Sequence, residues 1–116
     1  METCLPMLKV FKPSQHITEV NAQEIRDWVK ESLSSGAKHL LIDFKDVQFI
    51  NSSGLGALAI ALKDAREAGC DLALCQLNPQ ARMTLEISGM DQAFDIYSNQ
   101  DDFVQKIPSA AQPKTA

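Results

Sequence analysis

The residues of this sequence best suited to chemistry stand together in the motif NSSGLG, which begins at Asn51. Asn51, Ser52 and Ser53 are residue types that favour a helix start, because their side-chain oxygens accept hydrogen bonds from free backbone amides. Gly54 and Gly56 are unusual in a first helical turn, since glycine costs about 1 kcal/mol relative to alanine inside a helix. They leave the helix start open, so that another backbone or a phosphate group can approach it closely. The free amides and the positive end of the helix dipole predict a place that favours an anion.

The helix that follows this motif is apolar on more than one side. At about 100° per residue, one face carries the apolar residues that we assign to the core: Leu55, Leu58, Ala59 and Leu62. Ile60 falls on the opposite side, which it shares with small, hydroxyl-bearing or charged residues: Ser53, Gly56, Ala57 and Lys63. A single exposed isoleucine is ordinary, but here it lies beside small residues and hydroxyls. We interpret this outer side as a shallow patch into which a partner protein can pack.

These residues need a scaffold, and the apolar pattern predicts alternating strands and helices. Strands are expected at 5–11, where the strand should lie at a sheet edge, then 39–44, 71–76 and 94–97, with a less distinct one at 15–18. Helices are expected at 22–35, 52–68, 79–88 and 101–106, and the segment 45–51 is interpreted as a connection. The apolar run 40–42 is typical of a strand covered on both faces. Strand–helix alternation predicts an α/β fold with right-handed crossovers and a largely parallel sheet.

Capping residues should set the ends of these helices. Asn21 is expected to cap the first helix, with Glu24 three positions later in a pattern close to a capping box. Asn78 and Pro79 should open the third helix, because proline fits the first helical turn. Glycines follow three of the helices and are expected to end them: Gly36, Gly69 and Gly89.

Length and composition limit the class of protein. The chain has 116 residues, a net charge of −4 and 45% hydrophobic residues. These values predict one globular domain over 1–107, followed by a disordered tail at 108–116 that has no apolar period. The negative charge argues against direct binding to nucleic acid or to an anionic membrane. No stretch is long and apolar enough to span a bilayer and no signal peptide is evident, so a cytoplasmic protein is expected.

The cysteines do not predict a disulfide framework or a metal site. The chain has three of them, Cys4, Cys70 and Cys75, and an odd number that is widely spread argues against paired bridges. Cys70 and Cys75 are five residues apart around a predicted strand, so they should face opposite sides of it. We therefore expect free thiols, no metal ion and no cofactor.

One long stretch of the sequence resembles a known family. Residues 40–90, LLIDFKDVQFINSSGLGALAIALKDAREAGCDLALCQLNPQARMTLEISGM, are similar to the central part of the STAS domain (sulfate transporter and anti-sigma-factor antagonist). The similarity is greatest to the free-standing bacterial anti-sigma-factor antagonists. Their hallmark is an acidic residue, a phosphorylatable serine, Ser or Thr, then Gly-Leu-Gly at the start of the second helix. Here NSSGLG holds those positions, and the resemblance covers about residues 38–104.

The resemblance implies a single STAS-type domain with a mixed, mostly parallel sheet and about four helices packed mainly on one face. It also implies a protein without catalytic residues that binds an anti-sigma factor, itself a serine kinase, and so regulates transcription indirectly. The kinase would phosphorylate Ser52, or as a second choice Ser53, whereupon the complex would separate, and a PP2C-type phosphatase would reset the protein. Partner contacts are expected at Asn51, Ser53, Gly54, Gly56, Ala57, Ile60 and Lys63.

The sequence departs from the family pattern in two places. Asn51 stands where the family usually has an acidic residue. The early loop of the family often reads Gly-x-Leu/Ile-Asp, whereas residues 15–18 read QHIT here. Both departures lie near the expected docking surface, so both bear on the identity of the partner.

Other interpretations of the same residues stand beside this one. Ser52 and Ser53 could act only as helix caps. An enzyme has no support, because no GxxxxGK loop and no Ser-His-Asp or Cys-His set is present, and Asp43 and Asp46 are expected to serve loop hydrogen bonds. A phosphoaspartate receiver is rejected because the strand at 94–97 offers no lysine. A STAS module that acts as a non-switching scaffold remains an alternative.

Overall fold

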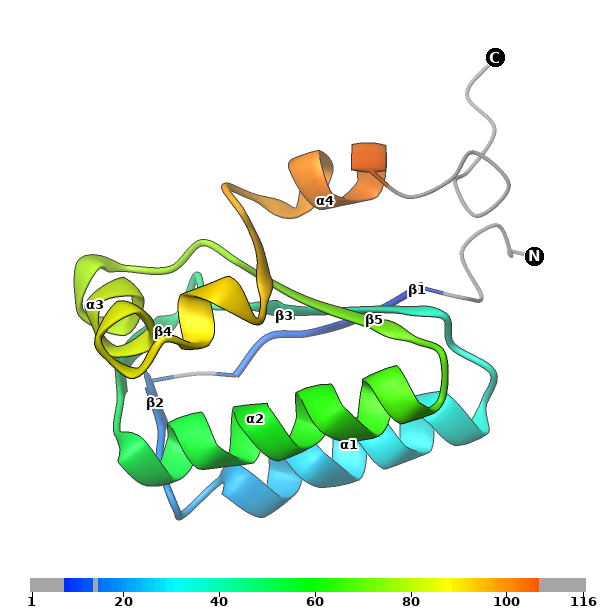
Figure 1. Cartoon of the computed structure of the whole chain (residues 1–116), viewed down its shortest axis with the longest axis horizontal. Coiled ribbons are helices and arrows are strands. Elements are labelled where there is room, and N and C mark those ends of the chain that lie inside the picture. Colours follow the sequence, from blue (N-terminus) through cyan, green and yellow to red (C-terminus); the bar gives the residue numbers. More distant parts are fainter. Residues whose placement is uncertain (1–7, 14, 107–116) are drawn as a thin grey trace.

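Four parallel strands form the central sheet of the computed structural model, which describes residues 8–13 and 15–106 (Figure 1). The strands lie side by side in the order β1 (Leu8–Phe11), β3 (His39–Asp43), β5 (Asp71–Cys75) and β6 (Asp95–Tyr97). Every pairing between them is parallel. The predicted α/β fold with a mostly parallel sheet is thus confirmed, with β1 at an edge. The tail expected at 108–116 lies outside the described residues.

A second ladder of two strands lies at one end of the molecule (Figure 1). β2 (Gln15–Ile17) and β4 (Val47–Ile50) pair in parallel there. The interpretation of 45–51 as a connection is wrong for β4, because side chains from a later helix support that strand. The Gln80 amide accepts a hydrogen bond from the Ile50 amide at 3.1 Å and donates one to the Ile50 carbonyl at 3.0 Å.

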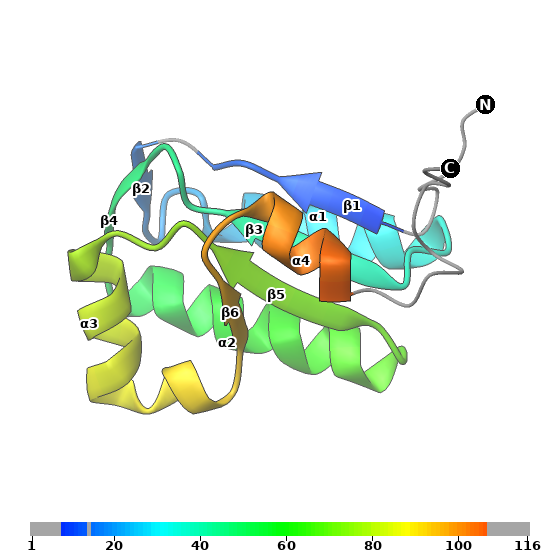
Figure 2. The same cartoon turned by 90° about the horizontal axis from the view of Figure 1, so that it is seen from above.

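Two long helices cover one face of the central sheet. α1 (Ala22–Ser34) and α2 (Ser52–Glu67) lie side by side and pack against each other (Figure 1). α3 (Pro79–Ser88) and the short 3-10 helix η1 (Met90–Gln92) lie at the end of the molecule that carries β4 (Figure 2). α4 (Gln100–Lys106) packs on the opposite face of the sheet. All four predicted α-helices form in the described part of the chain, and the two longest share one face.

The central strands bury side chains on both faces, as the apolar run 40–42 predicts. Leu40 and Ile42 are fully buried in the larger cluster, which α1 and α2 cover. Leu41, between them, points to the other face and packs with Phe103 of α4. Coverage on both faces explains why this strand has no polar alternation.

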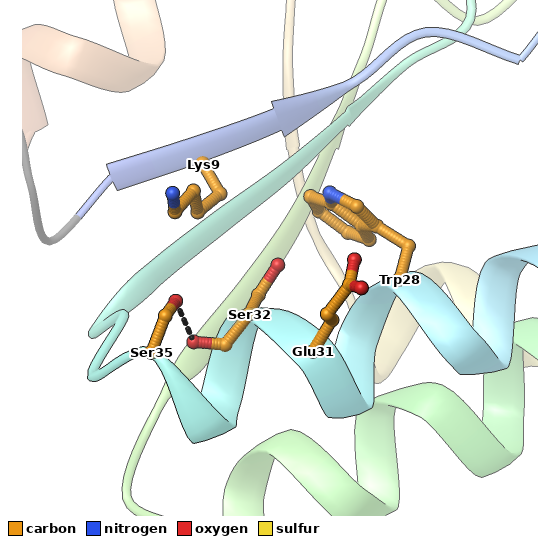
Figure 3. A pocket seen from close by; sticks show the side chains of 5 residues that line it. All are labelled: Lys9, Trp28, Glu31, Ser32 and Ser35. Atoms are coloured by element: carbon orange, nitrogen blue, oxygen red, sulfur yellow. Dashed lines mark hydrogen bonds between the residues drawn. The ribbon is translucent and has the colours of Figure 1, made fainter.

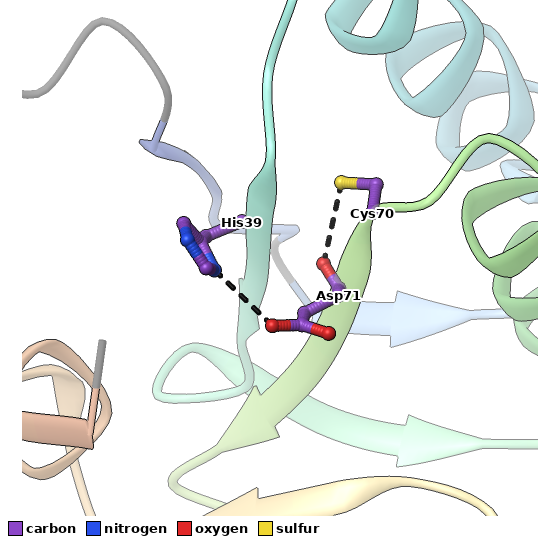
Figure 4. A network of polar contacts seen from close by, with 3 residues as sticks. All are labelled: His39, Cys70 and Asp71. Carbon is purple, nitrogen blue, oxygen red and sulfur yellow. Dashed lines mark hydrogen bonds and ion pairs between the residues drawn. The ribbon is translucent and has the colours of Figure 1, made fainter. Parts of the chain in front are cut away.

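Polar contacts join the beginnings of β3 and β5 (Figure 4). His39 Nδ1 and Asp71 Oδ2 lie 3.2 Å apart across the two strands, and the Cys70 thiol donates to the Asp71 carbonyl at 3.5 Å. Cys70 packs in the cluster beneath α1 and α2, whereas Cys75 packs in the cluster with α4. The two thiols are free and face opposite sides, as predicted, while Cys4 lies outside the described residues.

The capping residues explain most helix ends. The Asn78 side chain caps α3, and Gly89 ends that helix with a left-handed φ of 78°. Asn21 holds the N-cap position of α1, as predicted, but the capping box does not form, because its side chain makes no cap hydrogen bond to the helix. Instead its side-chain Oδ1 accepts a hydrogen bond from the Thr18 backbone amide at 2.8 Å, and its Nδ2 donates one to the His16 carbonyl at 2.6 Å. Asn21 therefore shapes the turn before α1.

Candidate functional site

The motif NSSGLG lies where β4 ends and α2 begins. Asn51 has extended backbone, and its Oδ1 caps α2 by accepting a hydrogen bond from the Gly54 amide at 2.9 Å. Ser52 and Ser53 are the first two residues of α2, and both are exposed. Within the described residues neither hydroxyl has a hydrogen-bond partner. Asn51 does the capping, so the interpretation of the two serines as mere helix caps is wrong.

The two glycines of the motif have different roles. Gly54 is buried, and a Cβ at this position would overlap the carbonyl of Ile17 and lie 2.8 Å from the Ile17 Cγ2. The opening left by Gly54 was predicted to admit another backbone or a phosphate, and the Ile17 backbone fills it. Gly54 is therefore not on the outer surface, which corrects the expectation that it contacts a partner. Gly56 is exposed, and apart from its chain neighbours and the nearby helix backbone, no atom of the described residues lies within 4 Å of where its Cβ would stand. Gly56 therefore keeps the outer surface of the first turn open.

The outer face of α2 is narrower than the helical pattern predicts. Ala57 is only 5% exposed, and it begins a row of buried alanines with Ala61 and Ala65. Small side chains at every fourth position allow a neighbouring helix to approach closely, and α1 packs on α2. The assignment of Ala57 to the outer patch is therefore wrong. Leu55 and Ala59, expected in the core, are half-buried.

Ile60 and Lys63 lie on the outer face of α2, as predicted. The Ile60 side chain is 42% exposed, which leaves a substantial apolar area for contact. Lys63 is well exposed, and its Nζ lies 3.9 Å from the Glu67 carboxylate one turn later. Such an exposed ion pair contributes at most about 1 kcal/mol to stability, so a partner can displace it at little cost.

The loop at residues 15–18 was expected near the docking surface, and the turn that follows it, residues 18–21 between β2 and α1, also lies against the motif. The Asn51 amide nitrogen donates to the Ile17 carbonyl at 3.2 Å, and the Asn51 Nδ2 donates to the Glu19 carboxylate at 3.0 Å. Val20, the next residue in the turn, is 86% exposed. The contact of the turn with Asn51 could not be predicted from neighbouring residues, because it depends on the pairing of β2 with β4, which are far apart in sequence.

β2 and β4 place two aromatic rings, those of His16 and Phe49, in contact with each other near the motif. His16 and Phe49 are register partners in the ladder, and their rings meet edge to face with centroids 6.1 Å apart. Phe49 is 42% exposed, although its strand neighbour Ile50 is buried. The apolar surface around the start of α2 therefore extends from α2 onto β4.

A charged side chain, the Glu19 carboxylate, contacts the motif by accepting a hydrogen bond from Asn51 Nδ2 at 3.0 Å. The first turn of α2 contains no acidic residue of its own. The hydrogen bond from Asn51 lowers the pKa of Glu19, with a smaller contribution from the Glu19 backbone amide. Glu19 is thus an anion at neutral pH, held beside a helix start that favours negative charge.

Two hollows elsewhere do not include the motif. One is a groove of about 270 Å³ between β1 and the second half of α1. Figure 3 shows the side chains that line it: Lys9, Trp28, Glu31, Ser32 and Ser35. A second, more polar hollow of about 210 Å³ lies where β1, β3 and β5 end. There the buried Asp43 carboxylate accepts from the Lys45 amide at 2.9 Å and from the Gln100 side chain at 2.8 Å. The prediction that Asp43 serves loop hydrogen bonding is confirmed.

Over residues 8–13 and 15–106, no group of three or more His, Cys, Asp or Glu side chains is placed to hold a metal ion. No helix in that part of the chain has the length and apolar character needed to cross a membrane. Burial raises the pKa of the Cys70 thiol to about 11 and that of Cys75 to about 12, which makes both poor nucleophiles.

Known proteins share this architecture and parts of this sequence. The STAS domain family matches residues 3–103. An anti-sigma F factor antagonist of Paenibacillus polymyxa is 33% identical over 63 residues, which cover 54% of this chain and 54% of that protein. The match thus spans about half the length of this curated relative.

Solved structures extend the likeness over nearly the whole chain. An anti-sigma-factor antagonist (STAS) domain protein of Planctomyces limnophilus has a TM-score of 0.70 at 25% identity, covering 86% of this chain and 89% of that one. The anti-sigma factor antagonist SpoIIAA in its unphosphorylated form has a TM-score of 0.74 at 16% identity, covering 92% and 96%. Its phosphorylated form, a Bacillus cell fate determinant, has a TM-score of 0.68 at 14% identity, covering 90% and 95%. The two SpoIIAA structures show a shared fold.

Proposed function

The chain belongs to the STAS domain family, and on that premise we propose that it is a cytoplasmic anti-sigma-factor antagonist. Its partner is an anti-sigma factor that is also a serine kinase, so its effect on transcription is indirect. The likeness to antagonists of this family supports the assignment. It binds through a docking surface made of the exposed and half-exposed residues around the start of α2: Val20, Phe49, Asn51, Ser52, Ser53, Gly56, Ile60 and Lys63.

The observation that carries the proposal is the state of the Ser52 hydroxyl. It is exposed at the start of α2 and has no hydrogen-bond partner within the described residues, because Asn51 caps the helix. A kinase can therefore reach the hydroxyl without first breaking an intramolecular contact. Gly56, one turn further along, has no side chain of its own, and the space where its Cβ would stand is open among the described residues. Ser53 is the second candidate for modification, since it is equally exposed.

Phosphate on Ser52 then acts as the release signal. The group adds about −1.5 to −2 charges at pH 7. In the free protein, water solvates the phosphate, and the helix dipole stabilises it by roughly 0.3–1 kcal/mol. In the complex it would be desolvated among apolar side chains such as Ile60 and Phe49, which costs more. A penalty of about 3 kcal/mol already weakens binding about a hundredfold, and a PP2C-type phosphatase restores the binding form.

Intact mass of the protein isolated from its own cells tests the switch. We expect a form heavier by one phosphate under some nutrient or stress conditions, lost in Ser52→Ala and kept in the neighbouring control Ser53→Ala. A pull-down with Ser52→Ala as bait should capture the kinase, because this variant cannot be released by phosphorylation. Absence of any phosphorylated form, together with partner binding that is independent of a kinase, would instead establish a non-switching scaffold.

A further inference from the structure

The turn at residues 18–21 is a small unit held by its own side chains. The Thr18 hydroxyl accepts from the Val20 amide at 3.1 Å, and the Asn21 side chain accepts from the Thr18 amide at 2.8 Å. Asn21 also donates to the His16 carbonyl at 2.6 Å, which anchors the turn to β2. These bonds tie the turn together as a unit, and it presents Val20, 86% exposed, on the docking surface.

Glu19 is the side chain that connects this turn to the start of α2. The Asn51 Nδ2 donates to the Glu19 Oε1 at 3.0 Å, while the Oδ1 of the same amide accepts from the Gly54 amide at 2.9 Å. One amide group thus joins the turn to the helix, and Ser52 is the next residue along the chain. The Glu19 carboxylate therefore contacts the residue that directly precedes the proposed phosphorylation site.

We propose that Glu19 passes the modification state of Ser52 to the turn at residues 18–21, and thereby sets the position of Val20 on the docking surface. The inference rests on the proposed function only in taking Ser52 as the modified residue. Glu19 is a positioning residue here, because it acts through the turn and through Asn51.

The physical reason is competition between two anions for one helix start. A phosphate on Ser52 brings about −1.5 to −2 charges and three acceptor oxygens beside the Glu19 carboxylate. Both groups are favoured by the same dipole end, and they repel each other at a separation below the Debye length of about 10 Å at 0.1 M salt. The phosphate prevails because it is covalently fixed at the helix start and carries more charge. Glu19 then leaves Asn51, and the turn carries Val20 away from its place beside α2.

Phosphoserine inserted at position 52 during synthesis of the full chain allows the test without any partner. In amide-resolved NMR, we expect the signals of Glu19 and Val20 to shift between the unmodified and the modified protein. In Glu19→Gln the shift should fall to roughly half or less, since glutamine keeps the oxygen that accepts from Asn51 but carries no charge. The matched control is Glu24→Gln, which removes an exposed carboxylate in the first turn of α1 and should respond like the wild type.

Two outcomes would overturn the coupling. One is a set of turn signals that phosphoserine at position 52 leaves unmoved; the other is a shift of equal size in wild type and Glu19→Gln. A wild-type shift that shrinks in 1 M salt supports the electrostatic origin, since the Debye length is then only about 3 Å. Because the measurement needs neither kinase nor anti-sigma factor, a chain that binds no such partner yet shows the Glu19-dependent shift would contradict the proposed function alone.

Discussion

The carbonyl oxygen of Ile17 occupies the space in which a side chain at position 54 would begin. The same oxygen accepts a hydrogen bond from the Asn51 amide at 3.2 Å. β2 therefore ends directly against the first turn of α2, and the turn that follows β2 is carried to the docking surface. A glycine in the first helical turn, unfavourable by local propensity, is required by this contact between distant segments.

Substitution of the two glycines should have opposite effects on stability. Gly54→Ala forces the new methyl group into the Ile17 backbone, so we expect a loss of about 1–3 kcal/mol or more in the free energy of unfolding. Gly56→Ala enters open space and should stabilise α2 by up to about 1 kcal/mol. Urea denaturation of both variants measures this difference. Equal stabilities would show that β2 does not press against Gly54.

Asn51, and not either serine, should carry the cap energy of α2. Asn51→Ala removes the acceptor for the Gly54 amide and the donor to Glu19, and should cost about 1 kcal/mol. Ser52→Ala and Ser53→Ala should each change stability by no more than about 0.5 kcal/mol, because their hydroxyls have no partner in the described residues. Thermal unfolding of the three variants distinguishes them, and a loss at Ser52 as large as that at Asn51 would contradict the assignment.

The two sides of α2 should respond differently to a carboxylate. Ile60→Asp lies on the docking surface, so the fold should persist while affinity for the partner falls about tenfold or more. Ala57→Asp places a charge in a position that is only 5% exposed, and should lower the melting temperature steeply. Calorimetric titration and melting curves measure the two effects. A collapse of Ile60→Asp would mean that the assignment of the faces of α2 is wrong.

The buried thiols should make stability fall in alkaline solution. Burial raises the pKa of Cys75 from 9.0 to about 12 and that of Cys70 to about 11. Above pH 9 the thiols of the unfolded chain lose their protons, while those of the folded protein keep them. The thiols' contribution to the free energy of unfolding is therefore present below pH 9 and is lost as the pH rises through their folded-state pKa values. Urea titrations at pH 8 and pH 10 should show this loss, reduced in Cys75→Ala.

The same pKa shift protects Cys75 from alkylation. At pH 8 a rise from 9.0 to about 12 leaves about a thousandfold less thiolate than in an ordinary thiol. Mass spectrometry after brief iodoacetamide treatment should find Cys75 unmodified in the native protein and modified in urea. Rapid native labelling would show that the strand is more accessible than its burial indicates.

Local patterns were sufficient for most of the scaffold. The apolar run at Leu40–Ile42 predicted a strand buried on both faces, and Asn78 and Gly89 marked the two ends of α3, because these signals depend only on near neighbours. β4 was missed for the opposite reason: its support comes from the side chain of Gln80, which lies 30 residues further along the chain.

The sequence by itself determined that a helix with an open, hydroxyl-rich start follows a buried strand, since capping chemistry and helical period are written in consecutive residues. Only the tertiary structure decided which of those residues face outward. Ala57 is buried, the β2 backbone fills the space beside Gly54, and Glu19 reaches Asn51 from 32 residues away. Burial and the proximity of charges depend on which segments pack together, and the helical period of one segment does not specify which other segments pack against it.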